Sequence, residues 1–122
     1  MTILQPPTVV PLTIAINTAI SGVLDTRYWS AGFVLIPSAW TAANLGFKFC
    51  DTSDGTFTIA KDEYGVPIQI ASISTAESFW YQFPEPQIFA GHFVELWSKS
   101  ATAAATTDVN QAAARSLTVI LK

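Results

Sequence analysis

The sequence has 122 residues and a formal net charge of −3, and charged residues make up 12% of it, where an ordinary soluble domain has about 25%. One domain is expected at this length. The six basic residues are scattered, which excludes a nucleic-acid interface of clustered Lys and Arg, and the single cysteine excludes an internal disulfide or a cysteine-rich zinc site.

The N-terminal residues 1–11, MTILQPPTVVP, contain three prolines, which are unsuited to helix interiors and central strands. We expect an extended arm here, either free or lying across a neighbouring subunit. The rest of the chain, residues 12–122, is expected to form a single β-sandwich domain.

Two kinds of apolar pattern follow the arm. Leu12, Ile14 and Ile16 alternate with polar or small residues, which is the period of a half-buried strand. After Gly22, a second strand is expected to begin at residues 23–28. The continuous apolar run GFVLI at residues 32–36 predicts a central strand buried on both faces.

The later strands are separated by turn signals at roughly ten-residue spacing. They are expected at residues 47–50, 56–60, 66–74, 78–83, 92–98 and 116–121. Eight or nine short strands with this spacing predict an all-β fold, an antiparallel sandwich or barrel. The segment 100–115, SATAAATTDVNQAAAR, breaks the pattern: either Asp108 caps a helical turn, or the small residues form a structured loop.

The stretch KFCDTSDGTFT at residues 48–58 gathers the most reactive side chains of the chain. Read as a calcium loop starting at Asp51, it has Gly55 at position five and Asp62 at position twelve, so the ligand pattern fails. Asp54-Gly55 between alternating apolar residues instead predicts a hairpin turn in which glycine supplies a positive φ. A weak cation site is the secondary interpretation.

No catalytic constellation emerges from the other chemical residues. Cys50 lies forty-two positions from His92, the single histidine, and no third partner is identified, so both are expected to be structural or surface residues. The candidate acids lie in turns or beside core aromatics and suggest no sugar cleft: Asp62, Glu63, Glu77, Glu85 and Glu95. No nucleophile elbow or phosphate-binding glycine loop is present. We therefore expect no catalytic residue, no cofactor, no metal and no enzymatic activity.

Adjacent aromatic residues in strands must point to opposite faces. One of Tyr28 and Trp29 is therefore expected to face outward, and so is Trp80 or one of its neighbours. With few charges nearby, subunit packing is favoured over sugar stacking as the use of these side chains. A mean hydropathy of +0.37 without any membrane-length apolar run also points to association with other protein chains and not with a membrane.

Two stretches resemble a known family. SAWTAANLGFKFCDTSDGTFTIAKDEYG, residues 38–65, has the layout W-T-x-A-x-L-x-F followed by S-D-G at residues 53–55, and residues 92–122 combine a strand, a small-residue loop with NQAA-x-R and a final strand. These features are similar to short structural proteins of tailed bacteriophages, over about two-thirds of the chain. The first layout also resembles the discoidin-like β-sandwich, whose relatives often bind carbohydrate.

The resemblance implies a virion component without catalytic residues. The leading expectation is a non-enzymatic capsid decoration (cement) protein that forms a homo-oligomer, provisionally a trimer, and clamps the major capsid protein or other virion proteins. Such a protein is assembled in the bacterial host cytoplasm and resides in the virion. The alternative is a discoidin-like or jelly-roll module on a tail or fibre that binds cell-surface sugar through Trp40 or Trp29.

Overall fold

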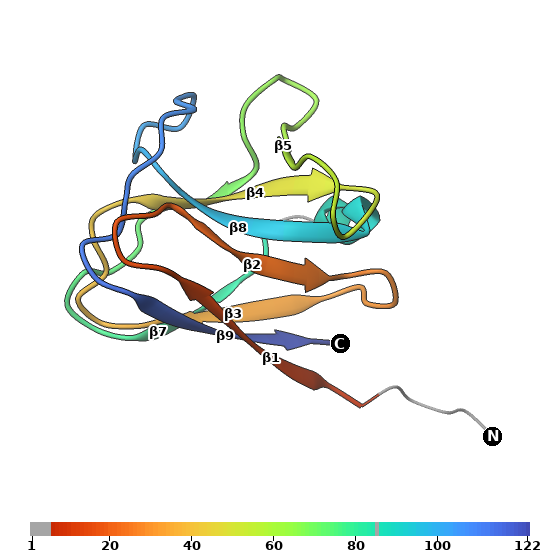
Figure 1. Ribbon diagram of the computed structural model, residues 1–122, viewed down its shortest axis with the longest axis horizontal. Coiled ribbons are helices and arrows are strands. Elements are labelled where there is room, and N and C mark those ends of the chain that lie inside the picture. Colours follow the sequence, from red (N-terminus) through yellow and green to blue (C-terminus); the bar gives the residue numbers. More distant parts are fainter. Residues whose placement is uncertain (1–5, 85) are drawn as a thin grey trace.

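Nine antiparallel strands make one curled sheet in the computed structural model, which describes residues 6–84 and 86–122 (Figure 1). The strands are β1 (Thr8–Ile14), β2 (Ile20–Asp25), β3 (Gly32–Ile36), β4 (Asn44–Cys50), β5 (Thr58–Ile59), β6 (Gln69–Ile70), β7 (Phe79–Gln82), β8 (Phe93–Lys99) and β9 (Arg115–Leu121). A short 3-10 helix, η1 (Pro86–Gly91), precedes β8. The strand order is β5-β4-β8-β2-β1-β9-β3-β7, with β6 also beside β4. The predicted all-β antiparallel fold is confirmed.

The sheet bends where β1 meets β2, because these two strands pair only at Ile14 and Ser21. On one side of the bend lie β2, β8, β4, β5 and β6, and on the other lie β1, β9, β3 and β7 (Figure 1). The two halves share one core, to which Phe47 contributes from β4 and Val119 from β9, both fully buried. Each large apolar side chain buried in this way contributes about 1.5–3 kcal/mol relative to exposure.

The N-terminal segment differs from the expected arm over residues 1–11. Residues 8–11 belong to β1 and pair with β9 from Thr8 opposite Leu121 to Pro11 opposite Thr118; residues 1–5 lie outside the described part of the chain. Proline is tolerated here because β1 pairs with β2 only at its far end, which leaves residues 8–13 at a sheet edge.

The strand at residues 32–36 is predicted with correct bounds, but the expectation that both its faces are buried is wrong. Val34 and Ile36 point into the core, whereas Phe33 keeps 45% of its surface exposed. Contiguous apolar residues therefore reflect a strand with one core face and one apolar outer face.

The expected hairpin at KFCDTSDGTFT is present, since β4 and β5 pair antiparallel through Lys48 with Ile59 and Phe49 with Thr58. The role expected of its glycine is wrong, because the positive φ of 77° belongs to Gly65 in the next turn. Gly55 is required for space: a Cβ at that position would collide with Cys50 Sγ and lie 2.6 Å from Thr52 Oγ1.

Candidate interaction surface

The outer side of the β1-β9-β3-β7 half carries two rows of side chains in register. Strand pairing places Val9, Ile120, Phe33 and Gln82 in one row, and Pro11, Thr118, Leu35 and Trp80 in the next. We call these eight residues the apolar face. Six of them are apolar, two are polar and none is charged, so the surface is predominantly hydrophobic.

The apolar face is open to solvent although its side chains are large. Val9 is 62% exposed, and Trp80, like Phe33, is 45% exposed. Lys122 lies at the margin, two residues beyond Ile120, where its backbone pairs with Ala31. Contiguous exposed apolar surface of this kind marks interaction sites on soluble proteins.

The outer side of the other half is different because it carries charge and is covered by the chain itself. Glu95, Trp97 and Lys99 alternate with the core residues of β8, and Lys48 of β4 lies opposite Glu95. Trp97 is nevertheless fully buried, and its Nε1 donates to Asp108 Oδ1 at 2.6 Å. The small-residue segment after β8 thus folds back over this side. Asp108 serves as an indole acceptor, and the helical turn considered for residues 108–115 does not form.

Lys99 is also fully buried on this covered side, which is unusual for a lysine. Its Nζ donates to Gln69 Oε1 at 2.7 Å, to the Ser100 carbonyl at 2.8 Å and to the Thr102 carbonyl at 3.0 Å. Desolvation by burial lowers the pKa of the Lys99 ammonium. All three ammonium protons have neutral acceptors, so this side chain fastens the loop to the sheet.

The two stretches that carry the family resemblance meet at Gln111, which is fully buried. Its Oε1 accepts from the Thr41 backbone N at 2.9 Å and from Arg115 Nε at 3.1 Å. Its Nε2 donates to the Thr41 carbonyl at 3.2 Å and to Ser98 Oγ at 2.9 Å. Thr41 of the W-T motif and Gln111 and Arg115 of the NQAA-x-R motif therefore hold two loops together by hydrogen bonds.

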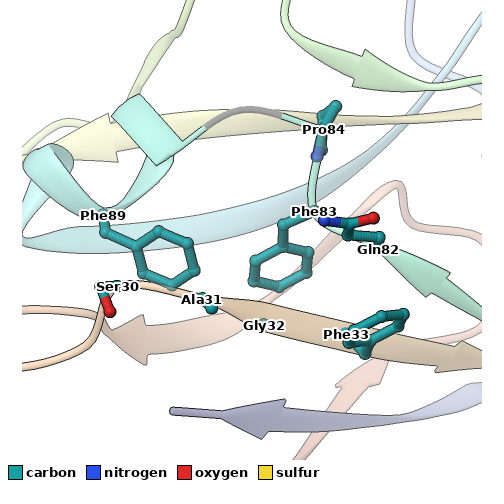
Figure 2. A pocket seen from close by; sticks show the side chains of 8 residues that line it. All are labelled: Ser30, Ala31, Gly32, Phe33, Gln82, Phe83, Pro84 and Phe89. Atoms are coloured by element: carbon teal, nitrogen blue, oxygen red, sulfur yellow. The ribbon is translucent and has the colours of Figure 1, made fainter.

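A pocket of about 290 Å³ adjoins the apolar face at the start of β3. Its lining residues are Ser30, Ala31, Gly32, Phe33, Gln82, Phe83, Pro84 and Phe89. Figure 2 shows the Phe83 and Phe89 rings side by side over the Ala31–Gly32 backbone, and their centroids are 5.8 Å apart. Gly32 allows this approach, because a Cβ there would lie 3.0 Å from the Phe83 ring. Phe33 and Gln82 belong to both pocket and face, so the pocket extends the same uncharged surface.

Cys50 and His92 are brought together by the fold, since their backbones form a β-bridge. Their side chains are arranged differently from a catalytic pair. The hydrogen-bond partners of the thiol among the described residues are Asp51 Oδ1 and Thr52 Oγ1, and His92 lies near enough to Asp25 to help lower the pKa of that carboxyl, after the larger effect of hydrogen bonding from Arg27. The geometry thus gives the thiol no imidazole base.

The acidic residues singled out in the sequence remain dispersed. Asp62 Oδ1 accepts from the backbone N of Tyr64 and of Val66, so this carboxylate organises a turn. Burial raises the pKa of Glu95, and the charge of Lys48 partly opposes that effect. Glu63 and Glu77 are exposed, and Glu85 lies outside the described residues. Within residues 6–84 and 86–122, no three His, Cys, Asp or Glu side chains converge as a metal site requires.

Trp80 faces outward on the apolar face and Tyr28 is 73% exposed, as predicted. The strand expected at residues 23–28 is wrong, however: β2 spans Ile20–Asp25, so Tyr28 is exposed in the turn that follows it. The two tryptophans considered for sugar stacking are less available. Trp40 is 2% exposed and its Nε1 donates to the Ala43 carbonyl at 3.1 Å, and Trp29 packs partly against the core. Replacing Trp40 would damage the core before it could report on a ligand.

The sequence alone did not predict the apolar face, because its residues come from strands in four separate parts of the chain. Its signal was present in each strand: Phe33 and Leu35 occupy the positions that alternate with core residues, as does Ile120 in β9. Only the strand order places them side by side.

Comparisons with protein-family models, with curated proteins and with solved structures found no match for this chain. Nor does the described part of the chain contain a helix with the length and apolar character needed to cross a membrane.

Proposed function

We propose that this chain is a non-enzymatic structural protein that packs its apolar face against other protein subunits. The observation that carries the proposal is the contrast between its two outer surfaces. One is charged and covered by the chain's own loop, whereas the other presents Val9, Phe33 and Trp80 to solvent without a charge among its eight positions. Uncovered apolar surface costs free energy in water, about 25 cal/mol for each Å² that a partner could cover.

Within this class, we propose a virion component that decorates and stabilises the head of a tailed bacteriophage as a homo-oligomer. The support is the family resemblance of residues 38–65 and 92–122, together with the hydrogen bonds by which Thr41 and Gln111 join those two segments. The major capsid protein or neighbouring virion proteins are the proposed partners, and the virion is the proposed location.

We also propose that the curled sheet is a sandwich of the discoidin-like or jelly-roll kind. The support is the core shared by the two halves, in which Phe47 from β4 meets Phe83 after β7 with ring centroids 5.5 Å apart. The sugar-binding function of some discoidin-like relatives is not part of the proposal, because Trp40 is buried and the apolar face offers few polar groups to orient a sugar.

Co-sedimentation tests the proposed function. The purified chain is mixed with empty shells assembled from the major capsid protein encoded with it, and bound protein is quantified after pelleting. Trp80→Ala should reduce binding at least tenfold, because it removes the largest side chain of the apolar face. Tyr64→Ala is the matched control: Tyr64 is 84% exposed on a distant turn and its loss should leave binding unchanged.

Failure of the wild-type chain to bind shells, or equal binding by both variants, would contradict the proposal. Binding of the chain to a glycan array with loss of signal in Trp80→Ala would reassign the apolar face to sugar recognition.

A further inference from the structure

The apolar face has a stepped profile. Its two aromatic side chains, Phe33 and Trp80, lie on β3 and β7, whereas β1 and β9 contribute only non-aromatic ones, Val9, Pro11, Thr118 and Ile120. The side chains of β3 and β7 therefore project further from the sheet (the high side of the face) than those of β1 and β9 beside them (the low side). A partner that fits this surface must be low where β3 and β7 are high.

A second copy of the same chain has that shape. A two-fold axis parallel to the strands, lying between two stacked sheets, places β7 of one copy over β1 of the other. Trp80 then lies over the partner's Pro11 and Phe33 over the partner's Ile120, so each aromatic ring meets a smaller, non-aromatic side chain, as close packing needs. Stacked sheets of this kind lie about 10 Å apart.

The absence of charge also favours a copy of the same chain. In a two-fold interface the same surface is used by both subunits, so any charge meets a like charge near the axis. The apolar face holds no charged residue among its eight positions, although the whole chain carries 15 charged residues and a net charge of −3. Such a surface can meet itself without repulsion.

The exposed area sets the strength of this contact. The exposed fractions of Val9, Phe33 and Trp80, with ordinary areas for the eight side chains, give on the order of 500 Å² per chain. Two copies would bury about 1,000 Å² together, which is where specific interfaces begin. A reversible dimer is expected, and not a permanent one.

We propose that the apolar face binds a second copy of this chain face to face across a two-fold axis. This inference rests on the proposed function, which makes the face an interface, and it names the partner that covers the face in solution. Because that dimer is reversible, a shell subunit can replace the second copy when the chain binds capsid. A three-fold assembly, as expected from the family resemblance, would require two different surfaces to meet. The single continuous face favours the two-fold arrangement.

Charge exchange at Thr118, near the middle of the face, tests the proposal by sedimentation velocity. The wild-type chain should pass from one to two times its 13.2 kDa mass as concentration rises. T118E alone and T118K alone should each dimerise at least tenfold more weakly, because two like charges meet. An equimolar mixture of the two variants should recover the dimer. The pair T58E and T58K on the exposed β5 is the matched control and should behave as wild type throughout.

Three outcomes would overturn the proposal: a wild-type chain that stays monomeric, a mass three times that of the chain, or a T118E and T118K mixture that fails to recover the dimer although urea unfolding shows both variants folded. The co-sedimentation assay separates this failure from that of the proposed function. A monomeric chain that still binds shells through Trp80 retains the structural function and loses the second copy as partner. A chain that dimerises but does not bind shells would support the second copy as partner and contradict the proposed function.

Discussion

Gln111 shows how a single polar residue can hold two distant loops. Its amide uses both donors and both acceptor sites of the oxygen on partners from residues 41, 98 and 115. Sequence reasoning placed this residue in a small-residue loop and linked it to a family motif, but two of its hydrogen bonds are made with Thr41, 70 positions away. Only the fold reveals that this motif joins two loops by hydrogen bonds.

Gln111→Ala should destabilise the protein by about 2–4 kcal/mol, because buried donors and acceptors around it would lose their partners. The free energy of unfolding from urea titration measures the effect. Asn110→Ala is the matched control, since it removes the same amide from an exposed neighbour and should change stability little. Equal losses in the two variants would contradict the assigned role of Gln111.

Glu95 gives the protein a pH dependence of predictable sign. Burial raises its folded-state pKa above the ordinary value of 4.5, so the stability associated with this group is full below that value and is lost as pH rises through the folded-state pKa. Glu95→Gln should therefore unfold less readily than wild type at pH about 7, by a fraction of a kcal/mol, and match it near pH 4.

Lys48→Gln should act in the opposite direction, because it removes the cation that partly offsets the burial of Glu95. Its stability loss should be larger at neutral pH than in acid. Urea titrations of both variants at the two pH values measure these differences. A Glu95→Gln variant that is less stable than wild type at neutral pH would contradict the predicted effect of burying Glu95.

Among the elements, those with a long apolar pattern were predictable. The apolar run of β3 predicted that strand, and the turn at residues 51–57 was predicted from Asp-Gly chemistry. The alternation from Leu12 predicted only the end of β1, which begins at Thr8 and stops at Ile14. The two-residue strands β5 and β6 were overestimated, because pairing with β4 and not local propensity sets their length. η1 was not expected, as Pro84 and Pro86 indicate a break without specifying a helical turn.

Gly46 in β4 sets how closely that strand packs under Trp97 of β8. A Cβ at this position would lie 2.6 Å from the Trp97 ring and 3.1 Å from Lys99 Cδ, both of which are held in place by hydrogen bonds elsewhere. Gly46→Ala should therefore destabilise the protein by about 2–4 kcal/mol through overpacking.

Gly22→Ala provides the matched control on β2, at the other side of β8, since its Cβ would meet only Leu12 Cδ2 at 3.9 Å. Urea titration should show little loss for this variant, because that distance is an ordinary contact. If the two alanine variants lost stability equally, the cost would come from the strand backbone and not from contact with Trp97.

At the scale of the whole molecule, the low charge content predicted that apolar surface would remain for a partner, but not where. The eight side chains of the apolar face come from strands that lie far apart in the sequence, and their register depends on β9 inserting between β1 and β3. The two outer surfaces differ because the loop after β8 covers one of them. Composition therefore predicted exposed apolar surface, and topology places that surface on one half of the sheet.

Salt provides a further prediction for the proposed dimer, because its two faces carry no charge. Raising NaCl from about 0.1 M to about 1 M should leave wild-type dimerisation unchanged or strengthen it, since only the repulsion between two net-negative chains is screened. The mixed T118E and T118K dimer should weaken over the same range, because it depends on an exposed ion pair. Sedimentation velocity at both salt concentrations measures the two dissociation constants. A wild-type dimer that dissociates in high salt would place the interface on charged residues, outside the apolar face.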